Sequence, residues 1–333
     1  MLFRDMSCSE LGRRVAIGLN DWMSLATRRS LVSCGRSVKE MERSISGFKP
    51  YQRECEAVLE WLGDPMNSIL FHGEDSYPSF EGLERHLPFF LLFRGPVPRR
   101  DVPCVGVVGT RRADYDGLHK AFEIGLGAAV CDTCVASGLA EGVDQAAMRG
   151  CLAAKGVCIG VIACGHDLEY PALTTRLRES IVDCGGCIVS RFPPGTPAYK
   201  GNFVSRNMVI AAYSQRLVVV QAPERSGSLI TCDYALSMGK DVLVSSEGLV
   251  QKGRSAPCRA GSQALVDDGA PVVASFSDMA DNLDAPVVKR VGSLSSMAHG
   301  YAFDDGCMFR FGDQVYCVER GGGRRFVVEN PLG

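Results

Sequence analysis

Six short apolar runs, separated by segments with helical spacing, constrain the fold of this chain more than any other feature. The runs occupy residues 103–109, 134–137, 157–165, 187–190, 216–222 and 241–246. Each is apolar along its whole length, which is typical of strands buried on both faces. Strands of this kind that alternate with helices form a parallel sheet covered on both sides. The sequence therefore predicts a doubly wound α/β fold, which binds ligands at the carboxyl ends of its strands.

Three units are expected along the 333 residues. Residues 1–63 form the first, a small helical domain, because apolar side chains recur at three- and four-residue spacing over 10–62. Residues 64–281 hold the strand pattern and form the second unit. The third is a tail, 282–333, in which two β-rich runs flank the glycines 321–323, and this predicts a short β-hairpin.

The charge balance sets a condition on function. The chain has 38 acidic and 36 basic side chains, so binding to a nucleic acid would require a local basic patch. The strongly apolar run near the start, 87–93, is far shorter than the roughly 20 residues that span a bilayer. The N-terminal residues also lack the apolar segment of a signal peptide. We expect a soluble, cytoplasmic protein without membrane contact.

The chain has 15 cysteines, and two pairs have the spacing Cys-x-x-Cys, at 131–134 and 184–187. Together these pairs could supply four thiolates to a zinc ion. Cys134 and Cys187 each lead into a predicted strand, however, where cysteine acts as a small apolar side chain. We therefore favour reduced thiols in the core, with no disulfide framework, metal or cofactor.

The turn after the first predicted strand reads GTRR and has the chemistry of an anion site. Gly109 permits a tight turn, and the backbone N–H groups at the start of the next helix attract negative charge. The guanidinium groups of Arg111 and Arg112, next to Thr110, are suited to phosphate. Two arginines on a solvated loop are the alternative explanation.

The turns after the second and fifth strands have related compositions. Ser137 and Gly138 leave the second strand, and Asp144 is expected to cap or pair at the following helix start. After the fifth strand, small and hydroxylated residues open a helix and could cradle a phosphate: Ser226, Gly227, Ser228 and Thr231. An ordinary serine N-cap is the alternative for this turn.

Residues 184–223 contain no Asp or Glu. They contain four cations, Arg191, Lys200, Arg206 and Arg216. Around a predicted helix start, cations alternate with an aromatic ring and amides: Lys200, Asn202, Phe203, Arg206 and Asn207. This combination suits a phosphate backbone with a stacked base, and a carboxylate beside a polyanion would be repulsive. We therefore predict that this stretch lies along a phosphate chain. A core position is the alternative for Phe203.

Several long motifs in one order resemble the DNA-processing protein A (DprA, or Smf) family over about residues 70–275. These are VGVVGTRR, SGLAEGVD, VIACGHDLEYP, RFPPGTPAYKGNFVSRNMVIAAYS, QAPERSGSLIT and MGKDVLVSSEG. The resemblance implies an extended Rossmann fold that binds single-stranded DNA without strong sequence preference and forms dimers or higher oligomers. It also implies loading of the RecA recombinase in natural transformation, without catalysis or a metal. The implied DNA contacts are Arg111 or Arg112, Lys200, Phe203 and Ser226 to Ser228.

Four positions depart from the family pattern. Arg191 replaces an acidic residue, which adds positive charge, and Met208 replaces an arginine. Gln221 replaces a glutamate, and VSSEG stands where relatives have AVPG. The resemblance implies a sterile-alpha-motif-like or helix-hairpin-helix-like domain for residues 1–63, although the GxGxxR hairpin of many relatives is not clear here. We expect the tail to lack the full winged-helix domain that many relatives carry.

Two enzyme classes are alternatives. A Rossmann-like nucleoside monophosphate phosphoribohydrolase also has a glycine-containing turn that opens a helix, but it needs a catalytic Glu where this chain has Asp233 and Tyr234. A dinucleotide-dependent oxidoreductase would need a GxGxxG turn and an acidic ribose ligand, and neither occurs here.

Overall fold

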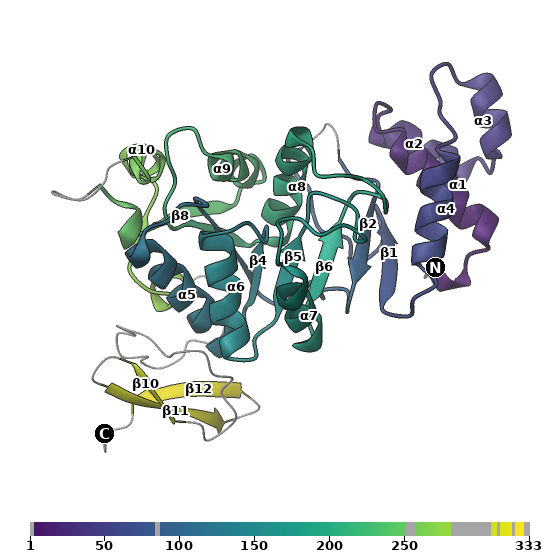
Figure 1. The fold of residues 1–333 in the computed structure, drawn as a ribbon. Helices are drawn as coiled ribbons and strands as arrows, with labels where there is room; N and C mark the ends of the chain where they lie inside the picture. The colour runs from purple at the N-terminus through teal and green to yellow at the C-terminus, as the bar shows by residue number, and fades with distance from the viewer. Residues whose placement is uncertain are drawn as a thin grey trace.

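The computed structural model describes residues 3–83, 87–250 and 257–280 and three later strands. Figure 1 shows a helical unit at one end, a central sheet with helices on both faces, and the late strands β10–β12. In the described part of the chain, no helix combines the length and apolarity needed to cross a membrane.

Six strands form the parallel centre of the sheet, in the order β6-β5-β4-β3-β7-β8. Their bounds are Cys104–Val108 for β3, Cys134–Ser137 for β4, Cys158–Val161 for β5, Cys187–Ser190 for β6, Arg216–Val219 for β7 and Asp241–Ser245 for β8. All six lie within the predicted apolar runs, so the prediction of a doubly wound parallel sheet is confirmed.

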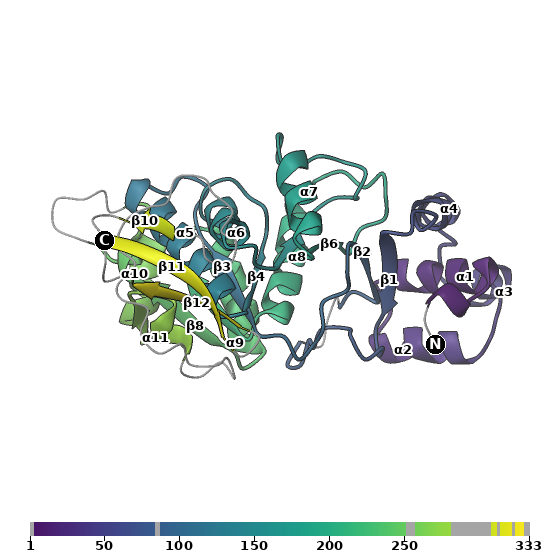
Figure 2. The same ribbon diagram turned by 90° about the horizontal axis from the view of Figure 1, so that it is seen from below.

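Additional strands extend both edges of this sheet. The strand β2 (Phe90–Arg94) pairs antiparallel with β6, and β1 (Asn67–Phe71) pairs antiparallel with β2. On the other edge, the short strand β9 (Val272–Val273) runs parallel to β8. Figure 2 shows β1 next to the N-terminal helices.

Successive side chains of the central strands point to opposite faces, and each face has its own helices. Val105 and Val107 of β3 pack in one buried cluster with helices α5, α6 and α7, whereas Cys104 and Val108 pack in another with α8 and α9. The helix bounds are Tyr115–Val130 for α5, Val143–Ala153 for α6, Thr175–Asp183 for α7, Lys200–Tyr213 for α8 and Gly227–Ser237 for α9. The short helices α10 (Ala260–Asp267) and α11 (Ser277–Ala280) complete the domain.

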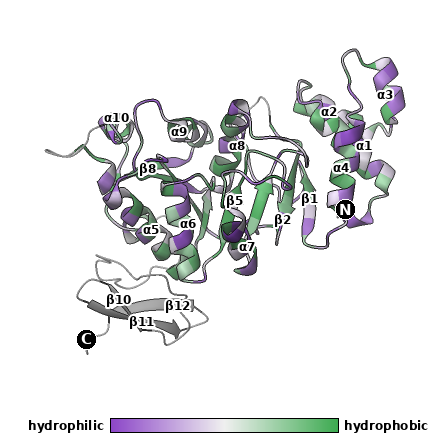
Figure 3. Cartoon of the chain, in the orientation of Figure 1, coloured by the Kyte–Doolittle hydropathy of each residue, from purple (hydrophilic) through white to green (hydrophobic). Residues whose placement is uncertain are grey.

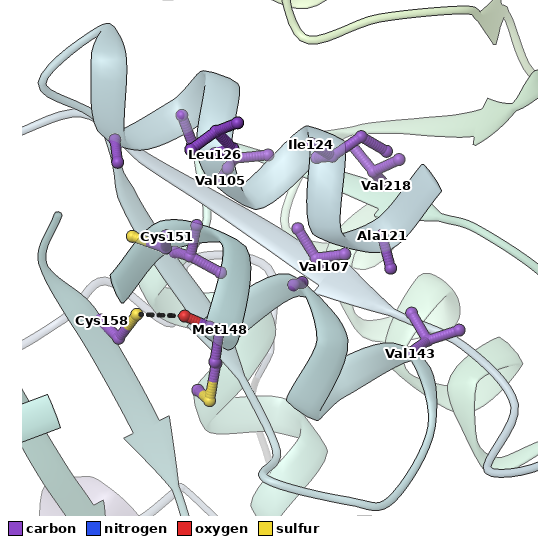
Figure 4. Packing of buried hydrophobic residues seen from close by; sticks show 14 of the residues in the cluster. Val105, Val107, Ala121, Ile124, Leu126, Val143, Met148, Cys151, Cys158 and Val218 are labelled. Atoms are coloured by element: carbon purple, nitrogen blue, oxygen red, sulfur yellow. Dashed lines mark hydrogen bonds between the residues drawn. The ribbon is translucent and has the colours of Figure 1, made fainter. Parts of the chain in front are cut away.

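Helices α5 and α6 pack closely because glycines face the partner backbone. A Cβ atom on Gly125 would collide with the carbonyl group of Ala147, and one on Gly150 would collide with that of Phe122. Figure 4 shows Ile124, Leu126 and other apolar side chains of this cluster between the helices and the sheet. This contact fixes the start of α6 relative to the end of β3.

The cysteines are part of this core. Cys131 belongs to the cluster under α5 and α6, whereas Cys134 belongs to the opposite cluster, so these two thiols do not converge on one metal ion. Burial raises the pKa of Cys131 to about 11 and that of Cys134 to about 12. The structure therefore favours apolar filling over the zinc alternative for this pair.

Four helices precede the sheet: α1 (Cys8–Leu19), α2 (Leu25–Ser33), α3 (Val38–Ser44) and α4 (Gln52–Trp61). Serine hydroxyls cap the first three, and Ser37 with Glu40 forms a capping box on α3. The apolar faces of these helices pack on Ile69, Phe71 and Phe90 of the β1–β2 pair. The helical unit therefore shares its core with the edge of the sheet.

Polar contacts also fasten this unit to the sheet. The buried Arg28 side chain donates hydrogen bonds to the carbonyl oxygens of Gly18 (3.4 Å) and Leu87 (3.0 Å). The Trp61 ring at the end of α4 stacks on the His166 imidazole, with centroids 4.6 Å apart. Because His166 follows β5, this stack joins the first and second predicted units.

The tail contains more β-structure than a hairpin. Strands β10 (Met308–Phe311), β11 (Gln314–Gly321) and β12 (Arg324–Glu329) form an antiparallel sheet in this order. Gly321 pairs with Arg324, as expected for strands that flank the triple glycine. The rest of the tail, including 282–307, lies outside the described residues.

The stacked His166 predicts lower stability in acid. Burial lowers the pKa of His166 to about 3, while an imidazole in an unfolded chain titrates near 6.5. The contribution of the neutral His166 to the free energy of unfolding is complete above about pH 6.5. It is lost as the pH falls, because between about pH 6.5 and about pH 3 only the unfolded chain takes up the proton. By pH 5 the loss of unfolding free energy is at most about 2 kcal/mol. Urea denaturation of the wild type and His166→Phe at several pH values measures it. Identical pH dependences for the two proteins would contradict this assignment.

Candidate nucleic-acid interface

The topological switch point of the sheet lies between β3 and β7. The chain leaves β3 for α5 on one face and leaves β7 for α9 on the other, which opens a crevice at the carboxyl ends of these strands. A cavity of about 360 Å³ lies here, which we call the strand-end cavity. It is lined by Val108, Gly109, Thr110, Arg111, Arg112, Ala140, Asp144, Phe203, Arg206, Asn207, Ile210, Pro223, Arg225, Ser226, Gly227, Ser228 and Thr231.

The GTRR turn forms one wall, held between β7 and the start of α6. The Thr110 amide donates to the Gln221 carbonyl oxygen at 2.7 Å. Gly142 has a φ of +84°, and a Cβ atom there would lie 2.5 Å from the Thr110 carbonyl oxygen. With the backbone fixed in this way, the side chains of Arg111 and Arg112 are exposed.

Gln221, which departs from the family pattern, supports this wall from behind. Its Nε2 group donates to Asp114 Oδ1 (2.7 Å), and its Oε1 atom accepts from the Asp114 amide (3.2 Å). Asp114 also caps α5 and pairs with the buried Arg259. An amide can both donate and accept here, whereas a carboxylate would face the Asp114 carboxylate across the same contact.

Phe203, in the first turn of α8, is half-buried and surrounded by cations and a second ring. The Arg111 guanidinium carbon lies 5.4 Å from the Phe203 ring centroid, and that of Arg206 lies 6.0 Å away. The Tyr170 ring meets it edge-on, with centroids 5.2 Å apart. The cavity therefore combines an aromatic surface with an exposed cation, a composition typical of binding sites for single-stranded nucleic acids.

Arg206 forms the floor of the cavity. It is 5% exposed and donates to the Val161 carbonyl oxygen at 2.9 Å. Burial lowers its pKa to about 10, and the negative charge of Asp144 opposes this shift. Burial raises the pKa of Asp144 to about 6, against the charge of Arg206 and a hydrogen bond from the Gly138 amide (3.0 Å). The sequence predicted that Arg206 binds phosphates, but its side chain is buried and bonded to the backbone.

Two further predicted site residues lie behind the wall. The hydroxyl of Ser137 is buried and donates to the Val107 carbonyl oxygen at 2.6 Å. A Cβ atom on Gly138 would collide with the Arg206 guanidinium, so this glycine makes room for the floor. Both residues hold the fold together and neither lines the cavity. The expected structural role of Asp144 agrees with its buried hydrogen bonds.

The SGS turn forms the opposite wall at the start of α9. The Ser226 hydroxyl accepts from the Ser228 amide (3.2 Å), and Asn207 Nδ2 donates to the Gly227 carbonyl oxygen (2.9 Å), which ties the turn to α8. Thr231 is buried below. Gly227 is exposed, and a Cβ atom there would meet nothing within 4 Å. The helix start thus presents backbone N–H groups in an approachable place.

Sequence reasoning missed Arg225 on this wall. Its exposed side chain lines the cavity opposite Arg111 and Arg112. The available signal was a cation directly before a glycine-containing turn that follows a strand.

Lys200 and Asn202 lie outside the lining, at the start of α8. Asn202 Nδ2 donates to the Pro197 carbonyl oxygen at 3.0 Å and so orders the preceding loop. The Lys200 side chain is exposed. Among the residues that the structure describes, no hydrogen bond or ion pair holds its ammonium group.

The acid-free stretch does not run along one surface, which corrects the prediction made from it. Arg191 turns toward the N-terminal unit, where its guanidinium lies 3.8 Å from the Asp21 carboxylate and is 10% exposed. Arg216 pairs with Asp241 at 3.3 Å. Together with the interior Arg206, this leaves Lys200 as the exposed cation of the stretch. The charge added at Arg191 therefore does not reach the cavity.

The lining of the cavity contains few acidic groups. Among the residues of its described lining, Asp144 is the one carboxylate, and it is buried. Asp233 and Tyr234, which occupy the region where a phosphoribohydrolase would need its catalytic acid, are not part of the lining.

Comparison with known proteins gives a consistent result. A family model described as DNA recombination-mediator protein A matches residues 68–284. A putative DNA processing protein DprA of Mycobacterium tuberculosis is 34% identical over 215 residues, covering 64% of this chain and 52% of that protein. DprA of Streptococcus pneumoniae is 34% identical over 215 residues, covering 65% and 73%. The chain thus spans about half the length of the first of these relatives and more of the second.

Two solved structures are also similar. The X-ray structure of DNA processing protein A from Streptococcus pneumoniae aligns with a TM-score of 0.62 and 25% identity, covering 84% of this chain and 94% of that one. DNA processing protein A from Helicobacter pylori, described for its unique single-stranded DNA binding mode, aligns with a TM-score of 0.55 and 24% identity, covering 64% and 93%. The second alignment shows a shared fold.

The buried charges behind the cavity predict a large stability effect. In Asp144→Ala, Arg206 would stay buried without its compensating charge, and we expect a loss of about 3 kcal/mol in unfolding free energy. Asp144→Asn, which keeps an acceptor for the Gly138 amide, should fall between this variant and the wild type. Denaturant titration followed by circular dichroism measures both. A wild-type midpoint for Asp144→Ala would show that the two charges are not coupled.

Proposed function

This chain belongs to the family of DNA recombination-mediator protein A, and on that basis we propose that it binds single-stranded DNA at the strand-end cavity. We assign the role to the unit 64–281, which holds the matched sheet. The observation that supports this most is that exposed Arg111, Arg112 and Arg225 line one cavity with Phe203, whose ring Arg111 contacts. The binding mode described for the Helicobacter pylori relative supports the same ligand.

The chemistry of the cavity fits the backbone of a single strand. Arginine side chains and the N–H groups at the start of α9 would bind phosphates, and the affinity would rise with each phosphate neutralised. Phe203 offers a ring for base stacking, which every base accepts. Recognition by phosphates and stacking predicts little sequence preference.

The strand would reach beyond the cavity at one side. Lys200 projects from the first residue of α8, in the same helical turn as Phe203. Its exposed ammonium group would extend the line of cations along the DNA backbone.

We propose further that the protein protects incoming DNA and loads the RecA recombinase during natural transformation, as a homodimer or higher oligomer in the cytoplasm. The support for these parts is the family membership and the names of the relatives. We propose that it acts by binding, without catalysis or a cofactor. Asp144, the acid of the cavity lining, is engaged with buried groups and does not face a substrate as a general base. Incubation with AMP should release no adenine, unlike a phosphoribohydrolase.

Truncating the rim cations should weaken DNA binding. We expect Arg112→Ala and Lys200→Ala each to cost about 1–3 kcal/mol of binding free energy, because each removes a charge-assisted phosphate contact. Fluorescence anisotropy with a labelled single strand over a salt series measures this loss, and a duplex of the same length should bind more weakly. Arg149→Ala is the matched control, since Arg149 is exposed on α6 outside the cavity. Unchanged titrations for both rim variants would refute this site.

A substitution at Gly227 should change the DNA affinity without lowering the stability of the fold. No protein atom lies near the position of its Cβ atom, so Gly227→Ala should fold as stably as the wild type or up to about 1 kcal/mol more so. The added methyl group would occupy the approach of a phosphate to the helix start, and we expect at least a several-fold loss of DNA affinity. Gly12→Ala, in α1, is the control, because its Cβ would make an ordinary 3.7 Å contact with Leu59. Equal DNA affinities for the two variants would count against the close approach.

A further inference from the structure

We propose that the N-terminal helical unit carries a second contact for the same DNA strand, on a surface formed by Trp22, Arg36, Lys39, Arg43 and Lys49. We call it the N-terminal basic surface. The inference rests on the proposed function, since it lengthens the path of a strand that enters the strand-end cavity. Its partner is a nucleic-acid backbone with unstacked bases.

The local charge is the first observation. Residues 22–53 contain seven Arg and Lys side chains and two acids, Glu40 and Glu42, in a chain whose net charge is −2. Six of the seven cations are exposed, and Arg28 is the buried exception. Glu40 is held by the Ser37 amide and hydroxyl in the capping box, which lowers its pKa and keeps it at the helix end.

The geometry of α3 places two cations together. Lys39 and Arg43 are four residues apart, so they share one side of the helix, and a third cation, Arg36, directly precedes the N-cap Ser37. The buried Met41 marks the opposite side, which packs on the helical core. Figure 3 shows α3 as mainly hydrophilic at the outer end of the unit. Among the described residues, none of these three cations forms a salt bridge.

An exposed tryptophan lies beside the segment that follows α3. Trp22 is 55% exposed, which is unusual for a large ring without a partner. Asn20 connects it to Lys49: the Trp22 indole donates to Asn20 Oδ1 (3.2 Å), and the Lys49 amide donates to the same oxygen (2.9 Å). Gly47, three residues beyond the end of α3, lies against the Trp22 ring. A stacking ring next to several cations matches sequence-tolerant binding of single strands.

The N-terminal unit meets the loop after β6, at the carboxyl end of the strands where the strand-end cavity also lies. A second cavity, of about 230 Å³, is lined both by the α1–α2 connection at 18–21 and by the loop at 191–196. That loop follows β6 and leads to Lys200. Asp21, the acid next to Trp22, is paired there with Arg191. The family departure at Arg191 thus reduces negative charge between the two proposed contacts.

The separation of the two surfaces sets the length of DNA required. Five strand spacings separate β3 from β1, or about 24 Å at 4.8 Å each. A strand of about 4 nucleotides, the lower end of the usual site size of a single binding fold, should therefore occupy the strand-end cavity alone. One of about 20 nucleotides exceeds the usual site of a single binding fold and should reach both surfaces.

The test compares these two lengths. Lys39→Glu/Arg43→Glu should bind the long strand at least tenfold more weakly and the short strand unchanged. The salt dependence for the long strand should fall by about 1.4 in log–log slope, the value for two lost phosphate contacts. In a Trp61→Phe background, which leaves Trp22 as the one tryptophan, the long strand should quench the fluorescence and the short strand should not. Arg99→Glu/Arg149→Glu is the charge-matched control, with both cations exposed on other elements.

The outcomes separate this inference from the proposed function. If Arg112→Ala weakens both lengths while Lys39→Glu/Arg43→Glu alters neither, the strand-end cavity stands and the second contact is refuted. Such a result would leave an acidic protein as the partner of the basic surface. If Arg112→Ala alters neither length and Lys39→Glu/Arg43→Glu weakens both, the cavity is refuted and the N-terminal unit would be the primary site, so the path proposed here would also fall.

Discussion

A buried guanidinium at the carboxyl ends of β4 and β5 holds together the edge of the sheet on which the site depends. Arg206 reaches from α8 to the carbonyl oxygen at the end of β5, fills the space that Gly138 leaves after β4, and shares the interior with Asp144 of α6. These contacts connect elements from both faces of the sheet. Phe203, one turn earlier on α8, and Arg111 on the neighbouring turn then take their positions over this floor. The contacts of the buried Arg206 thus position the turns that carry the exposed cations.

Much of the fold was predictable because the signals are local and repeated. Apolar runs such as 103–109 and 216–222 became strands, and the turns after them became walls of one cavity, since parallel strands bring their carboxyl ends to one edge. The antiparallel extension by β1 and β2 and the third strand of the tail were not predictable in detail. Their pairing depends on contacts between distant segments, such as that of Leu92 with Ser190.

The sequence predicted which turns form the site, but it did not predict which charged side chains are exposed there. A sequence shows which cations lack nearby acids along the chain, but Arg191 and Arg216 find their carboxylates at Asp21 and Asp241, far away in sequence. Burial also decides whether a hydroxyl such as that of Ser137 meets a ligand or a backbone carbonyl. Arg225 was overlooked because a single cation before a glycine-containing turn is a weak signal until the structure shows that its side chain is exposed in the cavity.

The stack of Trp61 on His166 has a mechanical consequence. Together with the core that the N-terminal helices share with β1 and β2, it joins the helical unit to the sheet by side-chain packing as well as by the chain itself. The distance between the helical unit and the central strands is then set by packed side chains. A polymer bound to both parts would have to fit the distance between them. It would be stretched or slack according to the number of its units between the two contacts.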